Sequence, residues 1–219
     1  PTFELNDALH YNIFKDNNIT FIINTILLLL YFDRLDNKLF KISDIDTTSF
    51  ITKEIALLSD QSSQFLTKCI KGYGLKKSLK LNIWEGPIDQ IDNQILNPQS
   101  EFYNKTFDTI IVFESSHSLQ KKYNLSSNKE RFSEEQFSRL QNLTNHLLRS
   151  THSRIILFNY YELNDQLYGN YSSKNITSFI FQLRKLNFLI SEYFSSTNLL
   201  SILDISSIQN RIGSKNMFD

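Results

Sequence analysis

The sequence predicts an α/β domain in which helices cover both faces of a parallel β-sheet. Five short apolar segments recur along the chain, and three are continuous apolar runs, typical of strands buried on both faces. Helical patterns lie between them, and small polar residues follow each segment abruptly. Because alternating strands and helices form doubly wound sheets with right-handed crossovers, we expect five parallel strands and a three-layer α/β/α domain.

The first 50 residues form a separate predicted unit, a helical segment that precedes an α/β domain at residues 51–219. Residues 21–32 are the most apolar stretch of the chain, but they are too short to span a bilayer, which takes roughly 20 residues. Exposed apolar patches of that size are rare on monomers, so we expect this stretch to dock on the domain. No basic and then apolar signal segment opens the chain, which favours a cytoplasmic location.

A polar linker at residues 43–52 joins the two units. Its SDIDTT segment resembles the Asp-x-Asp-x-Thr loop of haloacid-dehalogenase-type phosphatases, in which paired aspartates hold magnesium. That loop needs a strong strand before it and a Lys and acidic pair later in the chain, and neither is found here. We therefore interpret Asp44 and Asp46 as solvated linker residues.

The strands of the domain are expected at residues 54–58, 79–84, 109–113, 154–158 and 199–203. A helix is expected to begin near Phe65. Another is expected at residues 133–149, where Ser133 and Gln136 have capping-box spacing. A further long helix is expected at residues 175–194.

Composition excludes several classes of function. The 23 Lys and Arg residues balance the 23 Asp and Glu residues, so the chain has no electrostatic footprint for nucleic acid or an anionic membrane. The single cysteine excludes an internal disulfide framework, and its helical apolar pattern indicates a core residue. The four histidines lack metal-ligand spacing. We expect no metal and no cofactor.

Polar residues gather where the predicted strands end, and parallel strands end at one edge of a sheet, where ligands bind. Asp60, Ser62, Ser63 and His117 are the candidate catalytic residues, and the candidate binding residues are Gln61, Glu85, Gly86, Ser116 and Asn159. One interpretation is an acyl-transfer or hydrolytic site with a serine nucleophile. The other is that these residues cap helices and close turns. We expect His117 to lie within reach of the turn at residues 60–63.

The ordered motifs LLSDQSSQFL, IWEGPIDQIDNQILNPQSEFY, IIVFESSHSL, FNYYELNDQLYGNYSSK, FQLRKLN and LDISSIQNRIGSKNMFD resemble the amino-terminal domain of FkbH-like proteins. The resemblance covers about residues 53–219. It implies an SGNH-hydrolase-like, flavodoxin-like fold with strand order 2-1-3-4-5. It also implies a partner, the phosphatase-like domain of haloacid-dehalogenase subfamily IIIC, which carries the magnesium chemistry. Such proteins activate small acyl units for acyl carrier proteins in polyketide-type pathways, or act in surface-glycan synthesis.

The chain departs from the SGNH pattern at the residues that would perform catalysis. The pattern places its nucleophile in Gly-Asp-Ser, whereas residues 59–61 read Ser-Asp-Gln. It requires Gly-x-Asn-Asp after the third strand, whereas residues 114–117 read Glu-Ser-Ser-His. Asp204 follows the fifth strand, but no histidine occurs after His152. Only Gly86, as a backbone oxyanion donor, fits its expected place.

These departures favour a non-hydrolytic SGNH-like domain, which would bind a carrier protein, an acyl group or the phosphatase half. The alternative is an acyltransferase or esterase that uses Ser62 or Ser63 with His117.

Overall fold

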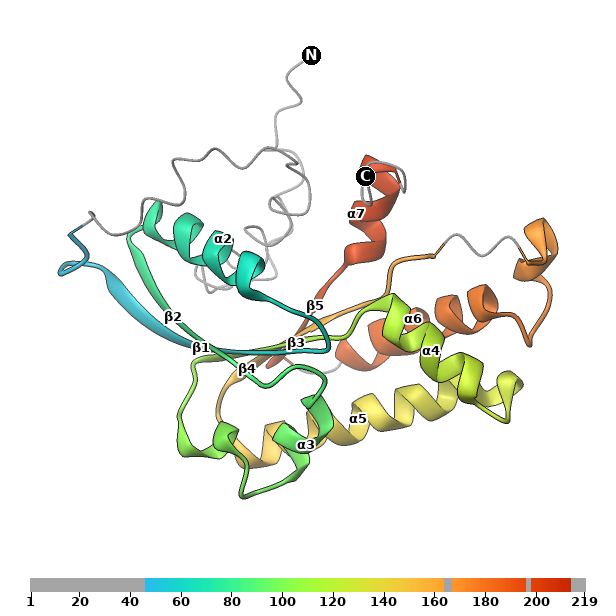
Figure 1. Ribbon diagram of the computed structural model, residues 1–219, viewed down its shortest axis with the longest axis horizontal. Coiled ribbons are helices and arrows are strands. Elements are labelled where there is room, and N and C mark those ends of the chain that lie inside the picture. The colour runs from blue at the N-terminus through green and yellow to red at the C-terminus, as the bar shows by residue number, and fades with distance from the viewer. Residues whose placement is uncertain (1–45, 164–166, 196–197, 214–219) are drawn as a thin grey trace, which may run out of the picture.

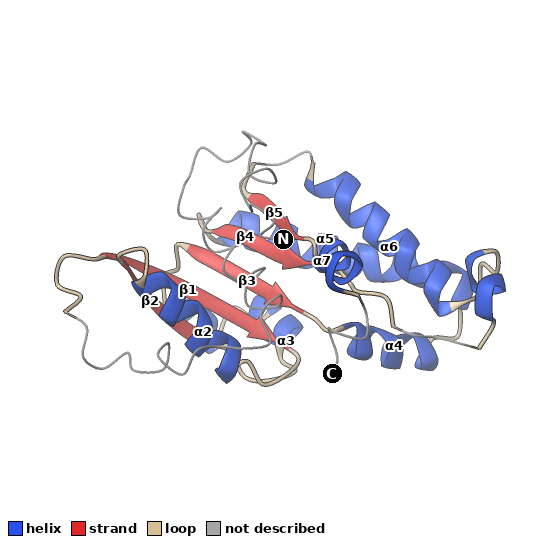
Figure 2. Cartoon of the chain, turned by 90° about the horizontal axis from the view of Figure 1, so that it is seen from above, coloured by secondary structure: helices blue, strands red, loops and turns tan. Residues whose placement is uncertain are grey.

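A computed structural model describes residues 46–163, 167–195 and 198–213. They form a five-stranded parallel sheet with the order β2-β1-β3-β4-β5, as predicted (Figures 1 and 2). The apolar stretch at residues 21–32 lies outside the described residues, so its docking and the division near residue 50 stay predictions. Among the described residues, no helix is both long and apolar enough to cross a bilayer.

The strands lie close to their predicted positions: β1 (Ile51–Ser59), β2 (Leu79–Glu85), β3 (Thr109–Phe113), β4 (Arg154–Phe158) and β5 (Leu200–Leu203). β1 is longer than expected at its amino-terminal end. There Ile51 pairs with Leu79 and Lys53 with Leu81 of β2. Backbone pairing thus extends a strand beyond the apolar run that predicted it.

Helices cover both faces of the sheet (Figure 1). They are α2 (Gln64–Leu75), α3 (Ile91–Leu96), α4 (Ser116–Leu125), α5 (Phe132–Ser150), α6 (Phe179–Phe194) and α7 (Ile205–Ile212), with short 3₁₀ helices η3 (Glu101–Asn104), η4 (Lys129–Arg131) and η5 (Gly169–Ser173). α2 and α7 lie on one face, and α3, α5 and α6 lie on the other.

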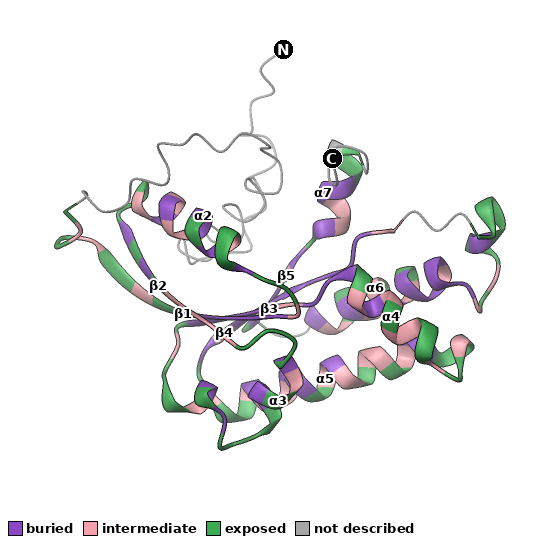
Figure 3. Cartoon of the chain, in the orientation of Figure 1, coloured by how far each residue is buried: buried purple, intermediate pink, exposed green. Residues whose placement is uncertain are grey.

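The core consists of two apolar layers, because successive side chains of each strand point to opposite faces. Ile110 and Val112 of β3 pack in the layer that includes α5 and α6, whereas Ile111 packs in the layer that includes α2 and α7. β3, β4 and the carboxyl-terminal half of β1 are accordingly mostly buried, while the outer faces of the helices are exposed (Figure 3). This arrangement leaves the carboxyl ends of the strands as the place where polar side chains meet.

The predicted starts of the two long helices are wrong by one to four residues. α5 begins at Phe132, and the Ser133 N–H donates to Gln182 Oε1 of α6 at 2.8 Å, so Ser133 and Gln136 form no capping box. α6 begins at Phe179, and Ser178 caps it by accepting a hydrogen bond from the Phe181 N–H. In the first case a contact between two helices replaces the local cap that the sequence pattern predicts.

Candidate functional site

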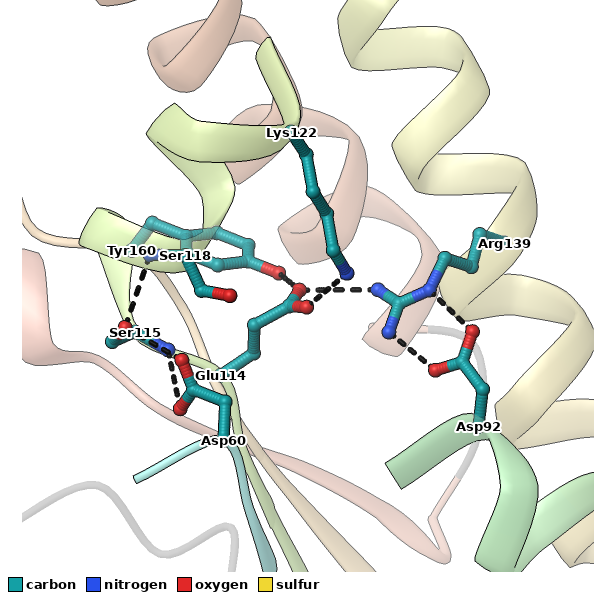
Figure 4. Close-up of polar contacts among 8 residues, drawn as sticks. All are labelled: Asp60, Asp92, Glu114, Ser115, Ser118, Lys122, Arg139 and Tyr160. Carbon is teal, nitrogen blue, oxygen red and sulfur yellow. Dashed lines mark hydrogen bonds and ion pairs between the residues drawn. The ribbon is translucent and has the colours of Figure 1, made fainter. Parts of the chain in front are cut away.

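Asp60, directly after β1, is bound to the start of α4. Its carboxylate accepts one hydrogen bond from the Ser115 N–H (3.0 Å) and one from the Ser115 hydroxyl (2.6 Å) (Figure 4). Ser115 Oγ also accepts a hydrogen bond from the Ser118 N–H, which caps α4. Because β1 and β3 are neighbours in the sheet, the residues after them meet as the strand order predicts. Asp60 therefore joins two strand ends.

The two candidate serines in the turn after β1 have different surroundings. Ser63 is buried, and its hydroxyl donates to Glu85 Oε2 at 2.6 Å. Ser62 and Gln61 are exposed, and the Gln61 N–H donates to Ser59 Oγ. Within the described residues, neither serine has a hydrogen bond to a histidine, so the serine–histidine pair of a hydrolase triad is not assembled.

His117 pairs with an aromatic residue that the sequence analysis did not select. Its Nδ1 lies 2.9 Å from the Tyr161 hydroxyl, and the neighbouring Ser116 hydroxyl donates to the Tyr161 carbonyl at 2.7 Å. Burial, and next the negative charge of Asp60, raise the pKa of Tyr161 to about 12. In the described part of the chain, His117 makes no hydrogen bond to the residue 60–63 turn, because Tyr161 after β4 is its partner.

The expected role of Gly86 as an oxyanion donor is wrong. Its N–H donates to the Leu57 carbonyl at 2.9 Å and so continues the pairing of β2 with β1. A Cβ at this position would lie 2.6 Å from Leu58 Cδ2, so close packing accounts for the glycine.

Asn159 and Asp204 form a structural pair after β4 and β5. Asn159 Nδ2 donates to Asp204 Oδ1 at 2.7 Å, and the same oxygen accepts a hydrogen bond from the Ser207 N–H at 3.0 Å. Asp204 thus caps α7, which is the role that short polar side chains commonly have before a helix.

Glu114, which was not among the predicted site residues, is the centre of a charged cluster (Figure 4). Glu114 is only 5% exposed, yet it accepts hydrogen bonds from the Tyr160 hydroxyl (2.6 Å), Arg139 Nη1 (3.1 Å) and Lys122 Nζ. Arg139 also binds both carboxylate oxygens of Asp92, with Nε 2.7 Å from Oδ2. A glutamate at the end of an apolar strand was the only signal in the sequence, and nothing local identifies its partners.

The charges of this cluster determine its protonation. Burial raises the pKa of Glu114, but Arg139 and Lys122 lower it by more, and the result is a pKa below the ordinary value. Burial and then the charge of Glu114 raise the pKa of Tyr160 well above its ordinary value. Glu114 is therefore a carboxylate and Tyr160 a phenol that donates to it.

A cavity of about 240 Å³ opens beside this cluster. Its lining residues come from the loop after β2, from α3, α4 and α5, and from the residue that follows β3. They are Asp89, Gln90, Ile91, Asp92, Asn93, Glu114, Lys122 and Arg139. In the described ranges, no three His, Cys, Asp or Glu side chains are placed to hold a metal ion.

Comparison with known proteins then decides the family. Residues 54–219 match the family described as FkbH, N-terminal domain. The chain belongs to this family. It is also similar to the crystal structure of the N-terminal part of protein BF1531 from Bacteroides fragilis, which contains a phosphatase domain complexed with Mg. The identity is 26% and the TM-score 0.73, over 90% of this chain and 48% of that one.

The FkbH N-terminal domain described here therefore spans about half of that neighbour. A second crystal structure, of the acetyl xylan esterase AlAXEase, has 11% identity and a TM-score of 0.43 over 74% of this chain and 84% of that one. This likeness is too low to support an argument about function. No curated protein matches the sequence.

Proposed function

We propose that this domain is a non-hydrolytic, SGNH-like binding domain of an FkbH-like protein. The observation that carries the proposal is that the candidate catalytic groups have other partners. The Ser63 hydroxyl donates to Glu85, the Asp60 carboxylate holds Ser115, and His117 Nδ1 pairs with Tyr161. In a serine–histidine–carboxylate triad the base beside the serine is a histidine, whereas among the described residues Ser63 has the Glu85 carboxylate as its partner and no histidine.

The proposed partner is the phosphatase-like domain of haloacid-dehalogenase subfamily IIIC, with an acyl carrier protein or its acyl group as the further ligand. The cytoplasmic role would be acyl-unit activation for polyketide-type or surface-glycan biosynthesis. Family membership and the phosphatase domain of the B. fragilis neighbour support the first partner. Two large exposed apolar side chains near the strand ends also support it: Phe65, in the first turn of α2, is 62% exposed, and Ile88, in the loop after β2, is 58% exposed.

The alternative, an acyltransferase or esterase, would use Ser62 or Ser63 with His117. What favours it is that Ser62 and His117 are both exposed, and both follow strands that are neighbours in the sheet.

A fluorophosphonate probe separates the two functions. The purified chain is incubated with the probe beside an active serine hydrolase, and peptides are mapped by mass spectrometry. We expect label on the hydrolase and none on Ser62 or Ser63. Label on either serine that disappears in His117→Ala would instead establish the alternative.

Binding is tested separately by titrating the chain with the phosphatase domain of an FkbH-like protein and with an acyl carrier protein. We expect saturable binding of the phosphatase domain that weakens in Phe65→Ser and Ile88→Ser. The matched control is Leu125→Ser. Leu125 is an exposed leucine at the carboxyl end of α4, whereas the amino-terminal end of that helix lies at the strand ends. Equal weakening by all three variants would contradict a surface at the strand ends.

A further inference from the structure

Two cations from different helices converge on the cavity beside Glu114. Lys122 extends from α4 and Arg139 from α5, and both point at the same buried carboxylate (Figure 4). Each carries more N–H donors than Glu114 uses, since an ammonium has three and a guanidinium five. The placement of Lys122 and Arg139 on one carboxylate is not needed to cap α4, which Ser115 does, and it is not part of the serine–histidine arrangement of a hydrolase. The cavity therefore has a cationic wall that the proposed partner binding does not explain.

Asp92 of α3 presents its carboxylate to Arg139, on the side of the guanidinium away from Glu114 (Figure 4). Both of its oxygens bind the Arg139 guanidinium, in the forked geometry by which arginine also holds ligand carboxylates and phosphates. The Asp92 side chain is 44% exposed, whereas that of Arg139 is 21% exposed. Asp92 is the more exposed partner, so its carboxylate can be hydrated when it turns into water, and Arg139 then keeps its hydrogen bond to Glu114.

We propose that this cavity binds a small oxyanion, a carboxylate or phosphate group, on Lys122 and Arg139, and that Asp92 occupies the position of that group in the free protein. Binding exchanges the ion pair between Asp92 and Arg139 for an ion pair between the ligand and Arg139.

The charges of the cavity fit a single anionic group. When Asp92 is turned away, Lys122 and Arg139 carry two positive charges and Glu114 one negative charge. Glu114 is buried and accepts three hydrogen bonds, so it stays in place. The remaining positive charge is neutralised by one anion. Asp89 also lines the cavity, but it is exposed, and water and salt screen its charge.

The size of the cavity sets the size of the ligand. Pockets for drug-sized ligands have volumes of roughly 300 Å³ or more, so a cavity of about 240 Å³ suits a small acid or the terminal group of a larger one. Anion binding at this site requires neither the phosphatase domain nor a carrier protein. The proposal can therefore be tested independently of the proposed function.

The experiment is a titration of the full chain with inorganic phosphate and, separately, with acetate, at constant ionic strength. Binding is followed by calorimetry and by the NMR signal of the Arg139 Nε–H. We expect saturable binding of at least one anion, and the two arms distinguish a phosphate from a carboxylate site. Asp92→Asn removes the internal competitor and should tighten binding about threefold to fivefold.

Two further variants test the cations. Lys122→Met and Arg139→Lys should each weaken binding about tenfold, the first by loss of charge and the second by loss of the fork. Lys121→Met, an exposed neighbour on α4, is the matched control and should bind as the wild type does. Thermal melts check that each variant folds, and Asp92→Ser replaces Asp92→Asn if that variant does not.

The proposal is overturned if neither anion moves the Arg139 signal of the wild-type chain in a saturable manner. It is equally overturned if Asp92→Asn binds more weakly than the wild type, because Asp92 would then be part of the site rather than its competitor. Equal losses in Lys121→Met and Lys122→Met would indicate nonspecific attraction and reject the cavity as the site.

Discussion

The Asp60 carboxylate accepts both the N–H and the hydroxyl proton of Ser115, at 3.0 and 2.6 Å. This pairing joins the end of β1 to the first turn of α4, across 55 residues of sequence. The aspartate that follows the first strand, and that the sequence suggests for catalysis, thus acts as a clamp between two neighbouring strand ends.

Asp60→Ala should lower the free energy of unfolding by about 1–3 kcal/mol, because two partly buried donors of Ser115 lose their acceptor. Urea denaturation measures the change. Gln61→Ala, at the exposed neighbouring position, is the control and should stay within about 0.5 kcal/mol of the wild type. If both variants are equally stable, the clamp contributes nothing.

Glu114→Gln should be more damaging, with a loss of about 3–5 kcal/mol near neutral pH, because it leaves Arg139 and Lys122 without their shared buried anion. Chemical denaturation of the variant gives this value. Glu101→Gln, at an exposed position in η3, serves as a charge-matched control. A loss in Glu114→Gln no larger than that of the control would show that the cluster is not a stabilising network.

The same glutamate predicts a pH dependence. Its pKa is lower in the folded protein than the ordinary value of 4.5, since Arg139 and Lys122 together outweigh the effect of burial. Its contribution to stability is therefore fully present above the unfolded-state pKa and lost as the pH falls through the folded-state pKa. Free energies of unfolding between about pH 3 and pH 7 should show the gap between wild type and Glu114→Gln narrowing in acid. A gap that stays constant would mean that Glu114 does not titrate in this range.

Gly86→Ala should destabilise the domain by about 1–3 kcal/mol, because the new methyl group would lie 2.6 Å from Leu58 Cδ2 in the core. Combining it with Leu58→Ala tests this cause directly. The double variant should lose less stability than the sum of the single variants, since the clash is removed. If the stability losses of the two single variants add strictly in thermal or urea unfolding, contact with Leu58 is not the cause of the loss in Gly86→Ala.

Hydrolysis of p-nitrophenyl acetate by the chain should not exceed the background rate, because the Ser63 hydroxyl is directed to Glu85 and its turn contains no histidine partner. Ser62→Ala and Ser63→Ala should leave this rate unchanged. Turnover above background that either substitution abolishes would favour the esterase alternative.

The class of fold and the positions of the strands could be predicted from the amino-acid sequence. Four of the five predicted segments begin within one residue of the observed strands. Strands buried on both faces, such as β3 and β4, are visible locally as continuous apolar runs, whereas the edge strand β2 is visible as an alternation of apolar and polar residues. The small polar residues after those runs also mark the strand ends correctly. Asp60 meets Ser115 because neighbouring parallel strands bring their ends together.

The pairing of the polar groups, in contrast, depends on how distant elements pack together. The partner of Glu114 on α5 lies 25 residues away in the sequence, and Tyr161, which pairs with His117, lies 44 residues away. Gly86 donates to a strand carbonyl, and the Ser133 N–H donates to another helix. The physical reason is that burial patterns repeat with the local geometry of the backbone, whereas a hydrogen bond or ion pair depends on the approach of side chains from elements distant in the chain.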